Sequence, residues 1–373
     1  MFSLVGSDWS QLSRSRLVCL GAQTSLDRLY ELTELVTPWS GPVSISVFVP
    51  DIELALALKY IQYLRSCYPA IHRQVSFHLS YPADHPGIQE VSFHHQLDSL
   101  DCQQPQQVLE LLLEERDEKM MSWRLSYPYP QNLLRNLAKE GCQTNYTYIS
   151  DIDMVPSPGM DLQLESFLLK DQERNNCTQC AFVIPTYEIS LNSSHLPQTK
   201  TELVEFLKKK EARQFHQEIW PLNQQSSDLQ RWEKIPETDE VEVAYKVENY
   251  KLLYEPIYVS RGDTPAFDER FIGFGFDRSS QVKTMSDEIN DMTLTLYLVQ
   301  VYEMWVAGYS FFLLNNIFTS HWGFQKSSAR PSWRLKQTGF NSRRFATFLK
   351  EVKAWDFIGF KLNRLYTADI CPL

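Results

Sequence analysis

The chain has 373 residues, of which 43% are hydrophobic, and its formal net charge is −10. This length and composition can bury a large core, either as one large domain or as two fused halves. The negative charge argues against a nucleic-acid partner, because binding to a phosphate backbone needs clustered lysine and arginine. The longest apolar region, residues 292–318, is interrupted by polar side chains, so no stretch is typical of a membrane span.

The first third of the chain alternates strand and helix patterns. Strands are predicted at residues 17–23, 43–49 and 75–81, and helices at residues 24–36 and 52–64. Thr24 or Ser25 can cap the first of these helices. The alternation predicts an α/β fold, a mixed, mostly parallel sheet with helices on its faces. The chain has neither a G-x-G-x-x-G nor a G-x-x-x-x-G-K-S/T motif, so it lacks a dinucleotide fingerprint and a P-loop.

A polar stretch at residues 80–107 reads as a loop, and two helices follow it. The helix predicted at residues 108–119 carries an acidic run, most simply a solvated face. The helix predicted at residues 131–140 leads into an apolar strand, and it carries Arg135, Asn136 and Lys139. These three side chains either form an exposed helix face or hold the phosphate or carboxylate of a donor substrate.

The most informative stretch, residues 145–160, reads NYTYISDIDMVPSPGM. Asp151 and Asp153 stand where the strand ends, and a Pro/Gly turn follows. Residues i and i+2 of an extended segment point to the same side, so both carboxylates can face one spot beyond the strand. Two hard oxygen donors there suit Mn²⁺ or Mg²⁺ together with a substrate diphosphate. The alternative is a surface turn with two solvated acids.

The C-terminal half continues the alternation and adds two polar motifs. A helix is predicted at residues 201–212, and strands at residues 181–187, 254–259 and 311–318. Residues 261–278, RGDTPAFDERFIGFGFDR, combine acids, glycines and aromatics, so one acid could serve as a base. Paired charges in a structural loop are the alternative. His321 follows the last strand and is a plausible third metal ligand, although a lone histidine there is more often structural.

Seven cysteines and three N-x-S/T sequons, at Asn145, Asn176 and Asn192, are compatible with a lumenal protein. Cys177-x-x-Cys180 could be half of a zinc site, but no second Cys/His pair has matching spacing. The pattern favours a loop, disulfide-linked if the protein is lumenal. In a secretory host we expect glycan on at least one sequon, with Asn145 the least accessible.

Five segments in this order carry a family resemblance: LVCLGAQTSLDRLYELTELVTPWSGPVSISVFVP, RNLAKEG, YISDIDMVPSPGM, PAFDERFIGFGFDR and VAGYSFFLLNNIFTSHWGF. From about residue 17 to about residue 350 the chain resembles the animal beta-1,4-glucuronyltransferase 1 family. It is also similar to the C-terminal catalytic domain of the bifunctional xylosyl/glucuronyltransferases that extend the dystroglycan glycan. The resemblance implies a GT-A-type nucleotide-sugar transferase fold and an inverting, Mn²⁺-dependent transfer from UDP-glucuronic acid, with Mg²⁺ as the other candidate metal. The acceptor would be a xylose-terminated O-mannosyl glycan of the α-dystroglycan type, extended with a β1,4 linkage.

The resemblance also implies roles for individual residues. Asp151, Asp153 and His321 match the metal-binding positions. The base would be Asp268 or Glu269, ahead of Asp277, and the sequence does not separate the first two. The residues assigned to substrate binding are Thr24, Arg135, Asn136, Lys139, Arg270 and Gly323. A glucuronyl donor carries a carboxylate that a planar guanidinium can bind, so Arg135, with Arg270 as the alternative, is the predicted cation. Arg270 could instead hold Asp268 or Glu269. On this reading Arg135→Met weakens UDP-glucuronic acid selectively over UDP.

The resemblance divides the chain into an extension at residues 1–16, a catalytic domain at residues 17–350 and a C-terminal tail at residues 351–373. Two departures stand out. The family begins with a cytoplasmic tail and a membrane anchor, and the first residues here resemble neither an anchor nor a signal peptide. Residues 282–300 form an atypical insertion, which could be a loop or an error in the gene model. By resemblance the protein is a type II membrane protein facing the Golgi lumen, where partner glycosyltransferases would act beside it.

Two other functions fit the same motifs. One keeps the fold and changes the donor or acceptor, for example to N-acetylglucosamine transfer, because motifs fix the metal and UDP better than the sugar. The other is an inactive lumenal scaffold for a partner transferase. The intact Asp151, Asp153 and His321 argue against the scaffold, whereas the insertion mildly favours it.

Overall fold

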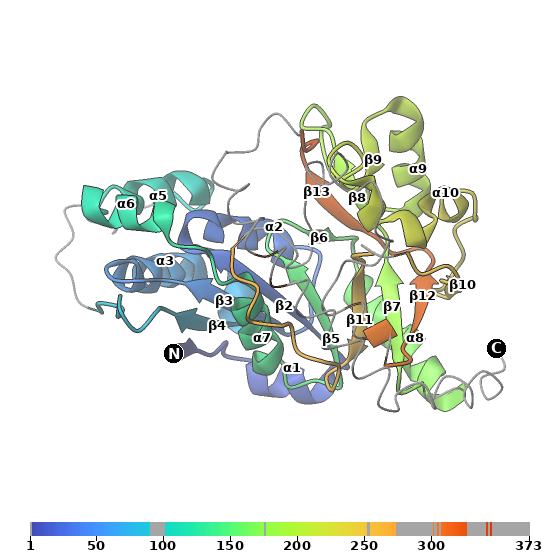
Figure 1. Ribbon diagram of the computed structural model, residues 1–373, viewed down its shortest axis with the longest axis horizontal. Helices are drawn as coiled ribbons and strands as arrows, with labels where there is room; N and C mark the ends of the chain where they lie inside the picture. Colours follow the sequence, from blue (N-terminus) through green and yellow to red (C-terminus); the bar gives the residue numbers. More distant parts are fainter. Residues whose placement is uncertain are drawn as a thin grey trace. The chain divides into compact units, whose positions relative to one another are not determined.

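The computed structural model describes residues 2–89, 101–174, 177–251, 254–273, 301, 304–305, 307–326, 341 and 344. The chain divides into two compact units (Figure 1). Unit 1 comprises residues 1–128 and 134–165, and unit 2 comprises residues 129–133 and 166–373. Each unit has its own part of the α/β architecture and is described by itself.

Unit 1 contributes five neighbouring strands in the order β1-β4-β3-β2-β5. Their bounds are β1 Phe2–Leu4, β2 Val18–Ser25, β3 Val43–Phe48, β4 Val75–Ser80 and β5 Tyr146–Asp151. The last four are parallel, and β1 pairs antiparallel with β4. Nearly all residues of β2, β3 and β5 are buried, as expected for parallel strands covered on both faces. The predicted α/β class is confirmed. The strands predicted at residues 17–23, 43–49 and 75–81 are also confirmed, as β2, β3 and β4.

The helices of unit 1 differ from the prediction at two places. Their bounds are α1 Trp9–Ser15, the 3₁₀ helix η1 Leu26–Glu31, α2 Leu32–Val36, α3 Glu53–Cys67, α4 Pro69–Gln74, α5 Pro105–Leu113, α6 Glu118–Ser126 and α7 Gln131–Gly141. The segment predicted as one helix at residues 24–36 is helical from Leu26 to Val36, but it consists of η1 followed directly by α2. Ser25 occupies the N-cap position without a side-chain cap bond, and the hydroxyl of Thr24 donates to the carbonyl of Ser25. The helix predicted at residues 108–119 also breaks. Asp117 accepts a bond from the amide of Met120 and so starts α6 as a new helix.

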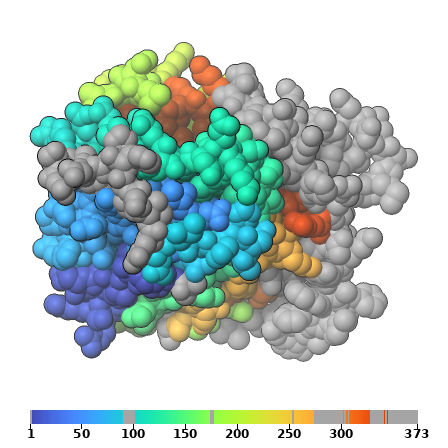
Figure 2. Space-filling view, turned by 90° about the vertical axis from the view of Figure 1, so that its left-hand side faces the viewer, coloured from blue at the N-terminus to red at the C-terminus, as the bar shows by residue number. Residues whose placement is uncertain are grey.

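A buried ionic cluster ties the α5–α6 region to α3 and η1. Glu53, at the start of α3, is fully buried, and its Oε1 lies 2.6 Å from Arg116 Nη2 and 3.3 Å from Arg124 Nε. The Arg116 contact is a charge contact without hydrogen-bond alignment. Both arginines also bond Asp27 of η1, at 2.5 and 2.7 Å. Figure 2 shows the α5–α6 segment, in teal, beside blue N-terminal segments on one face.

The two acids of this cluster titrate in opposite directions. Burial raises the pKa of Glu53 to about 7, although Arg124 and Arg116 oppose the rise. Burial also acts to raise the pKa of Asp27, but there the two arginines prevail and hold it at about 2. The buried acid therefore takes up a proton near neutral pH, whereas the half-exposed Asp27 stays ionised.

Glu53→Gln is expected to flatten the pH dependence of stability. An acid with a raised pKa favours the folded state below its unfolded pKa of about 4.5, and this contribution is lost as the pH rises to about 7. A shift of that size corresponds to about 3 kcal/mol. Denaturant unfolding between pH 4.5 and 7.5 should show a shallower slope for Glu53→Gln than for the parent and for the exposed control Glu140→Gln. Identical slopes in all three proteins would contradict the raised pKa.

Unit 2 holds part of the larger sheet and three strands of a small second sheet. Strands β11 (Ile257–Arg261), β7 (Cys180–Ile184), β12 (Ser310–Leu314) and β10 (Val243–Lys246) are neighbours in that order. In the small sheet, β8 (Thr186–Ile189) lies between β13 (Thr319–Trp322), which is parallel, and β9 (Ala212–Gln214), which is antiparallel. The other elements are α9 Lys200–Lys209, η2 Pro221–Asn223, η3 Gln225–Ser227 and α10 Leu229–Trp232. Two further elements near the unit boundary are β6 Val155–Pro156 and α8 Met160–Arg174. The strand predicted at residues 181–187 is divided by Pro185 into two strands, β7 and β8. The insertion predicted at residues 282–300 lies outside the described residues.

The core of unit 2 encloses a lysine. Lys200 Nζ lies 3.8 Å from the centre of the Trp232 ring and donates to the Trp232 carbonyl and to Asn315 Oδ1, at 2.9 and 2.5 Å. Burial lowers its pKa to about 8, against the attraction of Glu237 and Glu233. Trp232 in turn donates its indole N–H to the Leu314 carbonyl. These bonds join α9 and α10 to the end of β12, close in sequence to β13.

Three disulfides connect six of the seven cysteines. Cys19–Cys142 and Cys67–Cys102 lie in unit 1, and Cys177–Cys180 lies in unit 2. The Cys177–Cys180 bond confirms the predicted disulfide-linked loop, so these two cysteines are not half of a zinc site. Cys371 lies outside the described residues. No helix in the described part of the chain combines the length and the apolar character that a bilayer crossing requires.

Candidate active site

The two aspartates stand where β5 ends. Asp151 is the last residue of the strand, and the amide of Met154 bonds its carbonyl, so Asp153 sits inside the tight turn that follows. The side chains of Asp151 and Asp153 keep 23% and 18% of their surface exposed. They are therefore neither buried in the core nor freely solvated, and each has a cationic partner.

Asp151 is held from two neighbouring elements. Gln23 stands opposite it in the parallel register of β2, and Gln23 Nε2 donates to Asp151 Oδ1 at 3.2 Å. Arg135 of α7 donates from Nη2 to the same oxygen at 3.1 Å. The Arg135 side chain is only 1% exposed. A buried guanidinium paired with a carboxylate is costly to separate, so this contact fixes the direction of the Asp151 side chain.

Asp153 is held by the first turn after β2. Arg28 of η1 donates from Nη2 to Asp153 Oδ2 at 2.9 Å, and the same guanidinium binds Glu31 Oε1. Arg28 adjoins Asp27, which belongs to the Glu53 cluster. The two consecutive residues Asp27 and Arg28 therefore belong to two sets of ionic contacts, one with the α5–α6 region and one with the acidic turn.

The residues present suit a divalent cation. Carboxylate oxygens are the ligands that Mn²⁺ and Mg²⁺ prefer, and both aspartates retain exposed surface. No three His, Cys, Asp or Glu side chains of the described residues form a metal-binding group. Asp151 and Asp153 belong to unit 1, and His321 belongs to unit 2.

The other substrate-binding candidates in unit 1 are mostly buried. Arg135 and Asn136 are inaccessible, so the alternative of a solvated helix face is wrong for these two residues. Lys139 is half-buried. Thr24 is also buried, with its hydroxyl bonded to the Ser25 carbonyl. α7 therefore turns its polar positions inward beside β2 and β5.

In the PAFDER motif of unit 2, Arg270 clamps Asp268. Arg270 Nε lies 3.0 Å from both carboxylate oxygens of Asp268, and Nη2 lies 2.6 Å from Oδ2. Asn132 and the amide of Phe271 bond the Asp268 carbonyl, which holds the turn. Glu269 is exposed, and Asp277 lies outside the described residues. The prediction that Arg270 can hold Asp268 is confirmed by this contact.

His321 and Gly323 end the small sheet of unit 2. His321 lies on β13, with Nδ1 3.3 Å from the Gly323 carbonyl and Nε2 3.4 Å from Gln325 Nε2. Gly323 has φ +84°, a left-handed conformation that favours glycine, and its amide bonds the Ile189 carbonyl at 2.7 Å. The glycine thus turns the chain after β13 and sets the position of the segment that follows His321.

Sequence reasoning missed Gln23 and Arg28. Both follow from parallel pairing, because the carboxyl ends of adjacent parallel strands meet at one edge of a sheet. Gln23 is the last residue of the first predicted strand, and Arg28 lies near the start of the helix predicted after it. A polar residue at the end of one strand and a cation just beyond it are the signals that could have identified them.

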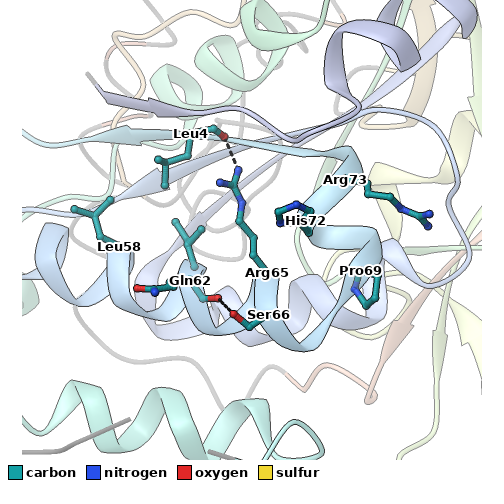
Figure 3. Close-up of a pocket in the computed structure, with 9 residues that line it drawn as sticks. Leu4, Leu58, Gln62, Arg65, Ser66, Pro69, His72 and Arg73 are labelled. Atoms are coloured by element: carbon teal, nitrogen blue, oxygen red, sulfur yellow. Dashed lines mark hydrogen bonds between the residues drawn. The ribbon is translucent and has the colours of Figure 1, made fainter. Parts of the chain in front are cut away.

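A separate cavity of about 700 Å³ in unit 1 serves the fold (Figure 3). Arg65 on α3 reaches across it and donates to the carbonyls of Leu4 and Val5, at 3.0 and 3.1 Å. Its guanidinium also lies 5.5 Å from the centre of the Phe77 ring. Arg65, one of the two arginines that line this cavity, is thus engaged in holding the edge strand β1 and the residue after it.

Two of the three sequons are at accessible positions. Asn145 and Asn192 are exposed, and Asn176 lies outside the described residues. Secretion from a eukaryotic host should therefore yield glycan on Asn145 or Asn192, detected as a mass shift that a glycosidase removes. Asn192→Gln and Asn145→Gln would assign each shift. Correctly secreted protein without glycan at any sequon would contradict a lumenal location.

Comparison with known proteins identifies the family. Residues 17–355 match the family model described as "Glycosyl-transferase for dystroglycan". The chain is 32% identical over 344 residues to beta-1,4-glucuronyltransferase 1 of Homo sapiens, covering 90% of this chain and 75% of that protein. It is 27% identical over 352 residues to the Danio rerio protein of the same name, covering 91% and 74%. It is 28% identical over 272 residues to xylosyl- and glucuronyltransferase LARGE2s of Gallus gallus, covering 71% of this chain and 29% of that one. The chain with the Asp151–Asp153 turn therefore belongs to the family of glycosyl-transferases for dystroglycan.

Proposed function

We propose that this glycosyltransferase moves glucuronic acid from UDP-glucuronic acid to a xylose-terminated O-mannosyl glycan, forming a β1,4 linkage with inversion. The observation that carries the proposal is the pair of partly exposed carboxylates at the end of a parallel strand, Asp151 and Asp153, each held by a guanidinium. The match over residues 17–355 and the names of the relatives support the proposed donor and acceptor class.

Asp151 and Asp153 would hold Mn²⁺, or Mg²⁺ in its place, against the donor diphosphate. The metal would supply positive charge that stabilises the leaving UDP. Gln23 and Arg135 keep Asp151 directed, and Arg28 keeps Asp153 directed, so the carboxylates need little reorganisation when a ligand arrives. In our proposal His321 is a further ligand from β13, and Asn136, Lys139, Thr24 and Gly323 shape the surroundings of the substrate.

Inversion by direct displacement needs a carboxylate that accepts the proton of the attacking hydroxyl. Asp268 shares both of its oxygens with Arg270, and protonation would weaken that pair. Glu269 is the neighbouring acid at an exposed position. We therefore assign the base to Glu269, give Asp268 the task of fixing the turn through Arg270, and keep Asp277 as the third candidate.

Arg135→Met is expected to weaken UDP and UDP-glucuronic acid together, because the buried guanidinium is bonded to Asp151. Removal of one partner of such a pair also lowers the free energy of unfolding by about 3 kcal/mol. Calorimetric titration of both ligands in Mn²⁺, with denaturant unfolding of the same samples, measures the two effects. Arg124→Met is not a suitable control because it breaks the Glu53 cluster. Arg14→Met, at an exposed position on α1, serves instead. Selective loss of UDP-glucuronic acid would show that Arg135 binds the donor carboxylate, as the sequence predicts.

The decisive experiment measures UDP release with Mn²⁺, a β-xyloside acceptor and a panel of UDP-sugars. Release with UDP-glucuronic acid alone, dependent on the acceptor, is the expected result. Faster release with UDP-N-acetylglucosamine or another donor would show that the transferred sugar is not glucuronic acid. No release with any donor, from folded protein that still binds UDP, would favour a scaffold for a partner transferase.

We further propose that the protein works in the lumen of the Golgi as a type II membrane protein. Disulfides are stable in oxidising compartments and are rare in the cytosol, and the described residues contain three. The exposed sequons at Asn145 and Asn192 are consistent with the same compartment.

A further inference from the structure

Unit 2 contains a groove whose lining residues have no role in the proposed transfer step. The groove, here called the β9 groove, has a volume of about 660 Å³, within the range of small-ligand sites. Its polar lining comes from the end of α9, from β9 and the loop after it, and from α10 and its C-cap. These residues are Lys210, Arg213, Gln214, Gln217, Glu218, Gln230 and Glu233. Phe324, directly after Gly323, supplies an aromatic wall.

The charges in the groove neutralise one another. Arg213 donates to Glu188 Oε2 at 2.6 Å, to Glu218 Oε2 at 2.8 Å and to the Gln325 carbonyl at 2.6 Å. Glu188 is fully buried, so separating it from Arg213 would leave a buried charge without its partner. The Arg213 guanidinium is therefore held in place. Among the described lining residues, Lys210 and Arg213 are balanced by Glu218 and Glu233. A phosphate or carboxylate ligand would find no excess positive charge, so the lining favours an uncharged ligand.

The remaining groups both donate and accept hydrogen bonds. Gln214 is fixed by a bond from Nε2 to Glu233 Oε1 at 2.9 Å, and Glu233 also accepts from the Tyr187 hydroxyl at 3.2 Å. The side-chain carbonyl of Gln214, whose orientation this bond fixes, can then accept a hydrogen bond. Gln217 and Gln230 are exposed side chains at the opening, and each amide offers two donors and an acceptor.

The aromatic wall is also fixed in place. The Arg213 guanidinium lies 4.6 Å from the centre of the Phe324 ring, so the ring is held by the same arginine that is anchored on Glu188. A pyranose presents hydroxyls around its edge and an apolar C–H face. Amides at the rim and an aromatic ring on the wall complement those two surfaces.

We propose that the β9 groove is a second glycan-binding subsite, which takes an uncharged pyranose of the acceptor chain away from the sugar that receives the transfer. This inference rests on the proposed function for the identity of the chain as a glycan. The groove would hold the glycan through two or three hydrogen bonds and would thereby favour long acceptors over a single xyloside.

The test compares a groove variant with a matched surface variant. Gln217→Ala/Gln230→Ala removes two exposed amides of the groove, and Gln143→Ala/Gln225→Ala removes two exposed amides elsewhere. All four residues are exposed, so both proteins should retain the Tm of the parent. Isothermal titration with β1,4-xylotetraose, an uncharged probe, should give an affinity about tenfold weaker for the groove variant only. A trigalacturonate probe should bind no better than xylotetraose.

Kinetics separate this inference from the proposed function. With UDP-glucuronic acid, the groove variant should raise KM for a long xylose-terminated acceptor and leave KM for methyl β-xyloside unchanged. If no UDP-sugar supports transfer, but xylotetraose binding still falls in the groove variant alone, the subsite stands and the proposed function fails. No xylotetraose binding by the parent protein, equal binding by both variants, or preferred binding of trigalacturonate would each overturn the subsite.

Discussion

Asp151→Asn and Asp153→Asn are each expected to lower the transfer rate by about a thousandfold without unfolding the protein. Each change keeps the shape of the side chain but removes a charged oxygen donor from the proposed metal site. The loss of charge stabilisation at a leaving group commonly costs a factor of this order. UDP release at limiting Mn²⁺ measures the effect, and circular dichroism with the unfolding midpoint checks the fold.

Asp84→Asn is the matched control, because Asp84 is an exposed aspartate of unit 1 away from the turn. It should retain the rate and the Mn²⁺ dependence of the parent. Excess Mn²⁺ should partly restore Asp153→Asn if the lost ligand weakens metal binding. Full activity of both site variants at limiting Mn²⁺ would remove the metal assignment.

Glu269→Gln is expected to lower kcat by about a hundredfold or more while UDP binding stays intact. A positioned carboxylate base contributes about 10² to 10⁴ in rate. Assays with saturating donor and acceptor measure kcat, and calorimetric titration with UDP in Mn²⁺ checks that binding is retained.

Asp268→Asn tests the division of roles in the same motif. Because Asp268 holds Arg270 through both carboxylate oxygens, this change should reduce stability and raise KM, yet leave kcat within a few-fold of the parent. Asp263→Asn, at an exposed position in unit 2, is the neutral control. A hundredfold loss of kcat in Asp268→Asn, with near-normal kcat in Glu269→Gln, would transfer the base to Asp268.

The strands were predictable because burial on both faces leaves an unmistakable pattern. The apolar runs at residues 17–23 and 43–49 have little alternative to a covered parallel sheet, and β2 and β3 occupy them. Helix boundaries were less predictable because local capping competes with periodicity. Asp117 could have been a solvated acid, but as an N-cap it divides the helix predicted at residues 108–119.

The aspartate turn was predictable from its sequence, whereas its partners were not. Asp151 and Asp153 follow an apolar strand and precede a Pro/Gly turn, and this pattern predicts that both stand at the end of β5. The burial of Arg135 depends on how α7 packs beside β2 and β5, and neither helical periodicity nor composition contains that information. The different roles proposed for Asp268 and Glu269 depend on the bidentate bond between Arg270 and Asp268. Two adjacent acids in a sequence do not reveal which of them an arginine binds.

The order of strands in unit 1 has a consequence for how the protein is made. β2 receives its neighbour β5 only after more than a hundred further residues have been synthesised, and Cys19 must wait for Cys142, 123 residues later. At about 5–20 residues per second, a nascent chain exposes one edge of β2 and a reactive thiol for about 6–25 s. An unpaired strand edge is a site of aggregation during that interval. The ribosome-bound chain should therefore depend on chaperones and thiol oxidoreductases until residue 151 emerges.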